Sequence, residues 1–273
     1  MHRRTLLGAL ASVGVCASTG GPAFAQADQF DALLAQLEAD PERLVESTWT
    51  QLESGVTRAI GQGEPSSRAI SERASNMIVS LEVSSRARYE ARYRRPIWPG
   101  GQSGVTIGIG YDLRFANEHF LQRDWGALLS ADMIATLTPV LRLGRTDARD
   151  ALPSVQSVDV PWDAALSQFR AFIPYPTKRT ENAFPNCAEL NDDSFGALVS
   201  LVYNRGAAMP LNSPRRREMR EIRDLMRDRN FAAVPGKIRE MKRLWSADTQ
   251  PGLHIRRDLE AALFELGLTS ARA

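Results

Sequence analysis

The stretch GVTIGIGYDLRF, Gly104 to Phe115, has the period of a β-strand but carries internal glycines and runs through an acid. Alternate residues of a strand point to opposite faces, so one face here is apolar and the other holds a hydroxyl, two glycines and a carboxylate. Glycine packs poorly in a strand and loses conformational entropy on folding. The pattern therefore predicts a bend or the close approach of another group. The apolar face comprises Val105, Ile107, Ile109 and Tyr111, and the nearly bare face comprises Thr106, Gly108, Gly110 and Asp112.

The two polar side chains of this stretch impose a geometric requirement. A straight strand would separate Thr106 from Asp112 by roughly 20 Å, at about 3.3 Å per residue. That distance is too long for both side chains to act on one water molecule. If they act together, the segment must bend, and the two glycines permit the bend.

A helix is expected before this stretch, in SRAISERASNMIVSLE. Apolar residues recur there at helical spacing and predict a buried stripe, with Ser66 or Ser67 available as the N-cap. Glu82 falls on the border of the stripe, so we expect it to look into a cleft. The alternative is an ordinary surface ion pair between Glu82 and Arg86, four residues later.

The pattern of the remaining chain predicts mostly helices. One long polar loop, PYPTKRTENAFPNCAELN, is expected between two of them. One short β segment among many helices predicts an α+β fold. Residues 26–62 are expected to form one or two amphipathic helices ahead of a main domain of residues 63–273. Helices are expected in LQRDWGALLSADMIATLTPVLRL, VPWDAALSQFRAFI, DDSFGALVSLVYN, SPRRREMREIRDLMRDR and PGLHIRRDLEAALFELG.

Residues 1–25 have the features of a secretory signal peptide. A basic start, MHRR, precedes an apolar run that is too short to span a bilayer, and small residues favour cleavage after Ala25. No later stretch is apolar enough for a membrane span, so we expect a periplasmic or secreted protein without membrane insertion. The chain has 34 basic and 32 acidic residues. Loss of Arg3 and Arg4 with the leader makes the mature protein formally neutral, which argues against nucleic-acid binding.

A pair of carboxylates remains as the candidate catalytic groups after the other chemistries are considered. The mature chain keeps His119, His254 and Cys187 and has no metal-binding motif, so neither a metal nor another cofactor is expected. No G-x-S-x-G elbow is present, and GIGYD lacks the third glycine of a dinucleotide loop. Glycoside hydrolysis uses one protonated and one ionised carboxyl. Glu82, beside an apolar stripe, suits the first role because partial desolvation favours the protonated form, and Asp112 suits the second.

The order of these segments resembles the phage-type lysozymes, the glycoside hydrolase family 24-like muramidases. MIVSLE resembles the helix end that carries the family's catalytic Glu, and VTIGIGYDL resembles its small β-hairpin. FGALVSLVYNRG resembles the core helix that ends in Asn and Gly, and GLHIRRDLEAALF resembles the final Gly-Leu, Arg-Arg, Glu helix. The four segments span roughly residues 66–267 in the family's order. The resemblance implies a lysozyme-like, mostly helical α+β fold with a small β-hairpin sheet beside an active-site cleft.

The same resemblance implies a muramidase that cleaves the glycosidic bond of peptidoglycan glycan strands. Glu82 would be the general acid and Thr106 would position the water. The common phage pattern has an Asp or a Cys between these two residues, but here Glu90 is the only acid between them. Asp112 follows Thr106 instead, as in the pesticin-like branch, and is therefore implied as the base or electrostatic partner. Whether the enzyme would retain or invert depends on the separation of the carboxyls and stays open.

Two further residues, Asn204 and Tyr111, are implied by the resemblance as substrate-binding residues, although strand alternation points Tyr111 toward the core. The Arg and Tyr rich stretch SSRARYEARYRR could contact acidic groups of peptidoglycan, or it could form a solvated basic face. Residues 26–62 could bind the wall, bind a protein partner or pack on the domain.

Two alternative functions belong to other classes. A catalytically inactive peptidoglycan-binding protein on a lysozyme-like scaffold is possible because a fold does not fix a function. A cysteine peptidase or amidase using Cys187 would cut peptide stems and would need that thiol to be reactive.

Overall fold

The computed structural model describes residues 22–44 and 63–270. In this part of the chain the fold is mostly helical, with one small two-stranded antiparallel hairpin. This agrees with the α+β prediction. The strands are β1 (Thr106–Ile107) and β2 (Tyr111–Asp112), and the helices are α1 (Pro22–Ala39), α2 (Pro41–Leu44), α3 (Glu72–Val83), α4 (Arg86–Arg92), α5 (Glu118–Trp125), α6 (Ala131–Leu137), α7 (Arg145–Ala151), α8 (Trp162–Phe172), α9 (Pro174–Ala183), α10 (Asp192–Arg205), α11 (Arg217–Arg227), α12 (Val234–Glu240) and α13 (Pro251–Ser270).

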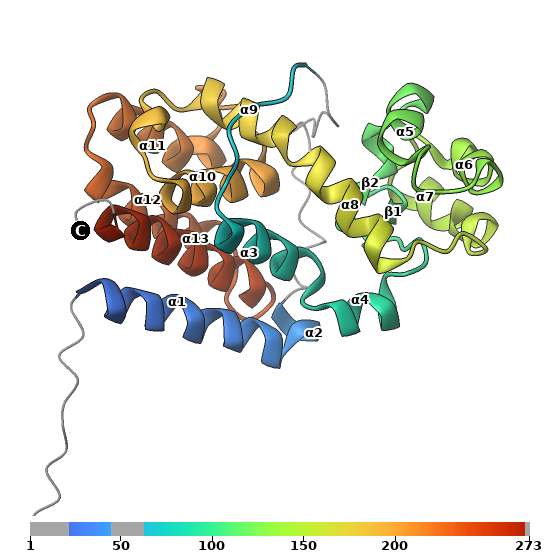
Figure 1. Cartoon of the computed structure of the whole chain (residues 1–273), viewed down its shortest axis with the longest axis horizontal. Helices are drawn as coiled ribbons and strands as arrows, with labels where there is room; N and C mark the ends of the chain where they lie inside the picture. The colour runs from blue at the N-terminus through green and yellow to red at the C-terminus, as the bar shows by residue number, and fades with distance from the viewer. Residues whose placement is uncertain (1–21, 45–62, 271–273) are drawn as a thin grey trace, which may run out of the picture.

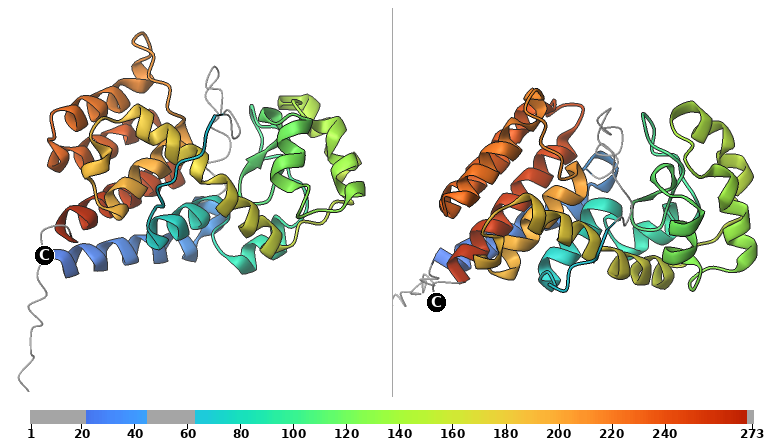
Figure 2. Two further views of the ribbon diagram at one scale, coloured as in Figure 1. Left: turned by 45° about the horizontal axis from the view of Figure 1, so that its top comes forward. Right: turned by 90° about the horizontal axis from the view of Figure 1, so that it is seen from above.

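The elements form two groups, which Figures 1 and 2 show from three directions. We call α1, α3 and α10 to α13 the C-terminal lobe, and β1, β2 and α5 to α7 the hairpin lobe. Helix α8 packs against α5 of the hairpin lobe, and α9 continues the chain to pack against α10 of the C-terminal lobe. These two consecutive helices therefore join the lobes.

The C-terminal lobe is built around α13, which packs against α1, α10 and α12. Most of its side chains are buried, and a helix that is covered on most sides belongs in a core. Helix α13 nevertheless carries Arg256, Arg257 and Glu260 within its buried surface. Because buried charges are costly unless they are paired, these side chains require partners. The sequence correctly predicted helices in the segments that form α10 and α13.

Helix α3 begins later than predicted. Its N-cap is Ser71, whose side chain accepts a hydrogen bond from the backbone N–H of Ala74, so the expected cap at Ser66 or Ser67 was wrong. The reason is tertiary: Ser66 donates from its hydroxyl to Glu181 of α9 at 2.7 Å, which holds the preceding chain in an extended path. The predicted apolar stripe is buried as expected.

The predicted polar loop between α8 and α10 was also wrong in its first half. Residues Pro174–Ala183 form α9, which follows α8 almost without a break. Pro174 and Pro176 fall in the first turn of α9, where the backbone N–H groups have no partner within the helix. Proline breaks a helix when it lies in the interior, but it is compatible with the first turn, where these two prolines lie.

The hairpin confirms the predicted bend. The strands pair antiparallel with Thr106 opposite Asp112 and Ile107 opposite Tyr111. Between them the chain turns through Gly108 and Gly110, with φ of 58° and 73°. Glycine adopts this left-handed region without the steric penalty that a Cβ would bring.

The prediction for the two faces of the hairpin is correct for one face only. The four apolar residues are buried, as alternation requires. The opposite face is not bare, however, because Thr106 and Asp112 are only 8% and 6% exposed. Neighbouring chain covers them: Asp112 accepts hydrogen bonds from the backbone N–H groups of Gly104 and Arg114.

Helix α1 packs its buried residues Phe30 and Leu37 in the core against α13. It begins at Pro22, so it includes the position after Ala25 at which cleavage was predicted. The rest of the predicted leader, residues 1–21, lies outside the described residues, as do residues 45–62 of the predicted N-terminal helical segment. Among the helices that the structure describes, none is long and apolar enough to cross a membrane.

Candidate functional site

Glu82 lies in the last turn of α3 and is 8% exposed. Its Oε1 accepts a hydrogen bond at 2.9 Å from Nη1 of Arg256 on α13. The expected alternative, a surface pair with Arg86, is wrong, because Arg86 lies 4.0 Å from Asp163 and both of those side chains are well exposed. The glutamate at the border of the stripe therefore faces the interior between α3 and α13.

Behind Glu82 lies a set of buried polar side chains, the Glu82 network, which comprises Glu82, Ser200, Arg256, Arg257 and Glu260. Arg256 Nε lies 3.3 Å from Oε1 of Glu260, which also accepts from Ser200 Oγ at 2.8 Å and from Arg257 Nη2 at 3.0 Å. Arg256, Arg257 and Glu260 are each 1% exposed or less. Two carboxylates thus balance two guanidinium groups in a space that excludes water.

The charge on Arg256 is maintained by its partners. Burial alone lowers the pKa of Arg256, but the charges of Glu82 and Glu260 outweigh burial and raise it. A guanidinium that is charged and held on both sides cannot rotate freely, so it fixes the orientation of the Glu82 carboxylate.

The hairpin meets Glu82 on its other oxygen. A Cβ built on Gly110 would lie only 2.8 Å from Oε2 of Glu82. Glycine is therefore required at position 110 for two reasons, its positive φ of 73° and the approach of this carboxylate. The question raised by the two glycines is answered in part: one of them makes room for Glu82.

Thr106 and Asp112 lie side by side across the hairpin, as the predicted joint action requires. Residues directly opposite each other in an antiparallel pair have Cα atoms about 4.5 to 5.5 Å apart, far less than the length of a straight strand. Asp112 Oδ1 accepts from the N–H groups of Gly104 and Arg114 at 3.1 and 2.9 Å. These bonds fix the carboxylate on the same face of the hairpin as Thr106.

The two predicted substrate-binding residues lie in different surroundings. Asn204, in the last turn of α10, accepts a hydrogen bond through Oδ1 from Arg257 Nη2 at 3.0 Å, so it adjoins the Glu82 network. Tyr111 is 3% exposed, and its hydroxyl donates to Asp124 Oδ2 at 2.8 Å. Its ring packs edge-on against Trp125, so Tyr111 lies in the core, and the residue also lines the pocket beside the hairpin.

A pocket adjoins the hairpin where the lobes meet. Its lining includes Gly110, Asp112 and the predicted substrate-binding residue Tyr111 from the hairpin, residues of α8 and α9, and the end of α10. The other predicted site residues, Glu82, Thr106 and Asn204, are not part of this lining. Three residues of its lining with polar side-chain groups were not singled out by sequence reasoning: Gln168 of α8, Arg179 of α9 and Tyr203 of α10. Burial lowers the pKa of Arg179. Gln168 sits in an apolar helix pattern that gives no sign of a pocket, so only the fold could reveal it.

The rival cysteine chemistry has little support. Cys187 is 6% exposed, and burial raises the pKa of its thiol. A raised pKa reduces the thiolate fraction that a nucleophile needs. Nε2 of His254 contacts the backbone oxygen of Trp245 at 3.0 Å. Within the described ranges, 22–44 and 63–270, no group of His, Cys, Asp and Glu side chains is arranged to hold a metal ion.

The Arg and Tyr rich stretch contributes to the core and to surface ion pairs. Tyr89 is fully buried and donates its hydroxyl to the backbone oxygen of Val160 at 2.8 Å. Arg94 pairs with Asp159 through two hydrogen bonds and with Glu90 at 3.0 Å. The side chain of Arg94 is 45% exposed, so this is a solvated, paired face.

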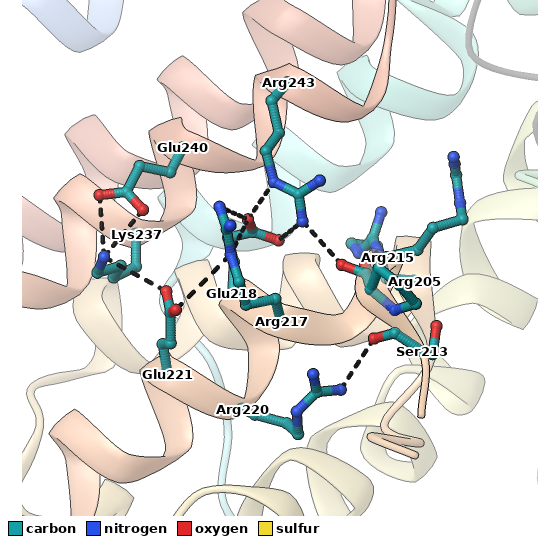
Figure 3. A network of polar contacts seen from close by, with 11 residues as sticks. Arg205, Ser213, Arg215, Arg217, Glu218, Arg220, Glu221, Lys237, Glu240 and Arg243 are labelled. Atoms are coloured by element: carbon teal, nitrogen blue, oxygen red, sulfur yellow. Dashed lines mark hydrogen bonds and ion pairs between the residues drawn. The ribbon is translucent and has the colours of Figure 1, made fainter. Parts of the chain in front are cut away.

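A second buried glutamate lies far from the hairpin, in the set of polar contacts drawn in Figure 3. Glu218 of α11 is fully buried and accepts hydrogen bonds from Arg243 at 2.5 and 3.0 Å and from Arg217 at 2.8 Å. We call these three residues the Glu218 network. Burial raises the pKa of Glu218, but the hydrogen bond from Arg243 and the nearby arginine charges outweigh burial and lower it.

Comparison of the sequence with protein-family models finds no match, and comparison with curated proteins finds none either.

Proposed function

We propose that the protein is a peptidoglycan hydrolase, a muramidase on a lysozyme-like fold, which cleaves the glycosidic bonds of the glycan strand outside the cytoplasm. One observation carries the proposal: Glu82 lies against Gly110 of the hairpin whose register sets Thr106 opposite Asp112. The Glu82 carboxylate adjoins the turn of this hairpin, and Thr106 and Asp112 lie on the two strands that the turn joins. Two carboxyl groups are what glycoside hydrolysis requires.

Glu82 acts as the general acid in this proposal. In the form that reacts, Oε2, the oxygen nearest the hairpin, carries a proton and donates it to the leaving oxygen of the sugar, while Arg256 holds Oε1 and stabilises the Glu82 carboxylate that remains after the transfer. Arg256 is a positioning residue, because it acts through the carboxylate and is itself buried.

Asp112 serves as the base or as the electrostatic partner of the positive charge that develops on the sugar ring. The backbone bonds from Gly104 and Arg114 hold its carboxylate in place before substrate arrives, which reduces the reorganisation needed in the transition state. Thr106, across the strand pair, positions the water with its hydroxyl.

The proposal is tested by measuring reducing sugar ends released from purified peptidoglycan. Wild type should release them, and Glu82→Gln should lower the rate by about 100-fold or more, the usual contribution of a general acid. Asp112→Asn should also be severely impaired. Glu218→Gln, a buried and ion-paired glutamate away from the hairpin, is the matched control and should keep the wild-type rate. Circular dichroism must show that each variant is folded.

The competing function, an inactive peptidoglycan-binding protein, is favoured by the absence of an Asp between Glu82 and Thr106. It predicts that wild type binds peptidoglycan without releasing reducing ends and that binding survives Glu82→Gln. That outcome would overturn the enzymatic proposal.

A further inference from the structure

The loop between α10 and α11 has an exposed apolar tip. Ala207 to Leu211, AAMPL, are all apolar. Leu211 is 83% exposed, and among the residues that the structure describes it is the one large hydrophobic side chain that is exposed. A single exposed leucine is common on protein surfaces and has no meaning by itself. The surroundings of the loop therefore decide what this tip can do.

Arginine side chains hold the backbone of the loop. Nη1 of Arg220 donates to the backbone oxygens of Pro210 and Ser213 at 2.6 and 3.0 Å, and Figure 3 shows this side chain directed at Ser213. Nη2 of Arg243 donates to the backbone oxygen of Pro214 at 2.7 Å. These bonds restrict the loop before any partner binds, so little conformational entropy is lost when its tip makes contact.

The base of the loop is basic. Residues 205–221 contain five arginines and two acids, and one of the acids, Glu218, is fully buried. Arg243, beside Pro214, adds a further positive charge. The side chains of Arg217 and Arg243 are 50% and 38% exposed, so part of this positive charge faces solvent. The field around the apolar tip therefore attracts anions.

An apolar tip with positive charge at its base matches the surface of an anionic bilayer. Such a tip enters the boundary between headgroups and acyl chains, while arginines at its base contact lipid phosphates. A protein partner matches less well. The centre of a protein interface is built from several large apolar or aromatic side chains, whereas Leu211 stands alone among the exposed side chains of the described residues.

We propose that this loop docks the protein on an anionic lipid surface, with Leu211 in the apolar boundary and the neighbouring arginines at the phosphates. The contact is peripheral, and one leucine with a few charges gives weak, reversible binding. The inference goes beyond the proposed hydrolysis, because residues 207–213 include none of the residues placed in the proposed site.

The test measures cosedimentation of the full chain with phosphatidylcholine vesicles that contain or lack phosphatidylglycerol, an anionic lipid. Binding should be tighter to the anionic vesicles and should weaken as ionic strength rises. Leu211→Asn should weaken it by about 10-fold or more, because the variant loses the burial of a leucine side chain. Leu211→Phe should keep it, since phenylalanine is also apolar.

Two arginines form a matched pair that tests the charge. Arg215 is partly exposed and follows the loop directly, whereas Arg149 is exposed on α7 of the hairpin lobe. Arg215→Gln should weaken binding to anionic vesicles by about 5-fold, the effect of one cation near such a surface. Arg149→Gln removes the same charge far from the loop and should leave binding unchanged.

A local probe separates contact at the loop from contact through the apolar run of residues 1–25. A polarity-sensitive fluorophore on Leu211→Cys should shift its emission to the blue when anionic vesicles are added. The same fluorophore on Thr146→Cys, an exposed position of α7, should not shift. Both variants carry Cys16→Ser, and the remaining Cys187 is only 6% exposed.

Absence of a shift at position 211 would overturn the proposal, as would equal binding of anionic vesicles by wild type and Leu211→Asn. A shift of the same size with neutral vesicles would overturn the assignment to an anionic surface. A shift with purified peptidoglycan or with an acidic protein, but not with vesicles, would assign the loop to that partner instead. Glu82→Gln should bind vesicles as wild type does, so the failure of this docking is distinguishable from a failure of the proposed hydrolysis.

Discussion

Two buried glutamates, Glu82 and Glu218, are held by arginines, but their networks end in different surroundings. Around Glu218 the arginines reach solvent: the side chains of Arg217 and Arg243 are 50% and 38% exposed. Around Glu82 the order is reversed. The arginine lies deep in the lobe, with Arg256 1% exposed, and the glutamate is at the outer end.

The reversal makes Glu82 a better candidate than Glu218 for the proposed general acid. Glu218 is enclosed by its own partners, and its carboxylate has both oxygens occupied by guanidinium groups. Glu82 has one oxygen fixed by Arg256 and the other directed at a hairpin from the other lobe. Residue type and burial alone do not distinguish the two glutamates. They differ in which group lies nearer to solvent: the arginines in the Glu218 network, and the glutamate in the Glu82 network.

The largest expected effect comes from removing the inner acid of the Glu82 network. Glu260→Gln leaves Arg256 and Arg257 buried with Glu82 as the one remaining acid of that network, and breaking a buried ion pair costs about 3 to 5 kcal/mol. Glu218→Gln should cost less, about 1 to 3 kcal/mol, because water can reach both of its arginines. Urea unfolding of the two variants measures the difference. Equal losses would mean that the two networks are equally desolvated.

The next prediction compares two glycine substitutions, in order to distinguish the effect of contact with Glu82 from the effect of backbone strain. Gly110→Ala and Gly63→Ala both place a Cβ at positive φ, 73° and 86°. That shared strain costs about 1 to 2 kcal/mol. Among the residues that the structure describes, none comes within 4 Å of a Cβ at Gly63, whereas at Gly110 Glu82 Oε2 lies at 2.8 Å.

Because Arg256 holds Glu82, the carboxylate cannot swing away without losing its ion pair. We therefore expect Gly110→Ala to lower release of reducing ends at least 10-fold and Gly63→Ala to leave it unchanged. Rates measured beside unfolding free energies check this. Similar activity in both variants would show that Glu82 relaxes freely.

Local patterns predicted the bend at the two glycines and helices in the segments that carry Glu82 and Arg256, because periodicity and glycine content report on a residue's immediate neighbours. They failed where a contact between residues far apart in the sequence determines the local structure. The partner of Glu82 lies 174 residues away, on a helix whose pattern shows charges but not what they meet. The start of α3 was misplaced because Ser66 forms a hydrogen bond with Glu181 of α9. Helix α9 itself was missed because its segment was predicted as a polar loop, although Pro174 and Pro176 are compatible with a helix start.

A smaller effect concerns the pH dependence of stability. Glu218 has a lowered pKa in the folded state, so as pH falls below its ordinary value of 4.5 the unfolded chain takes up the proton first. Folding stability therefore falls as pH drops from about 4.5 toward the folded pKa, by at most about 1.4 kcal/mol per pH unit for one proton.

Glu218→Gln removes this contribution, so its stability should change less steeply over the same range, although the variant is less stable at neutral pH. Unfolding free energies of wild type and variant from pH 3 to 6 measure the difference. Parallel curves would mean that the Glu218 carboxylate is not stabilised by Arg243 and Arg217.

The smallest expected effect concerns the arginine closest in sequence to Glu82. Arg86 lies one helical turn away by spacing, but its side chain is 62% exposed and pairs at 4.0 Å with an exposed aspartate. Such pairs contribute at most about 0.5 kcal/mol, so Arg86→Ala should leave both stability and the release of reducing ends near wild type. Arg256→Met is the contrasting variant and should impair both, because it leaves Glu82 buried without its cation. If Arg86→Ala lost activity and Arg256→Met kept it, the short-range partner would control Glu82, and the distinction between the networks would fail.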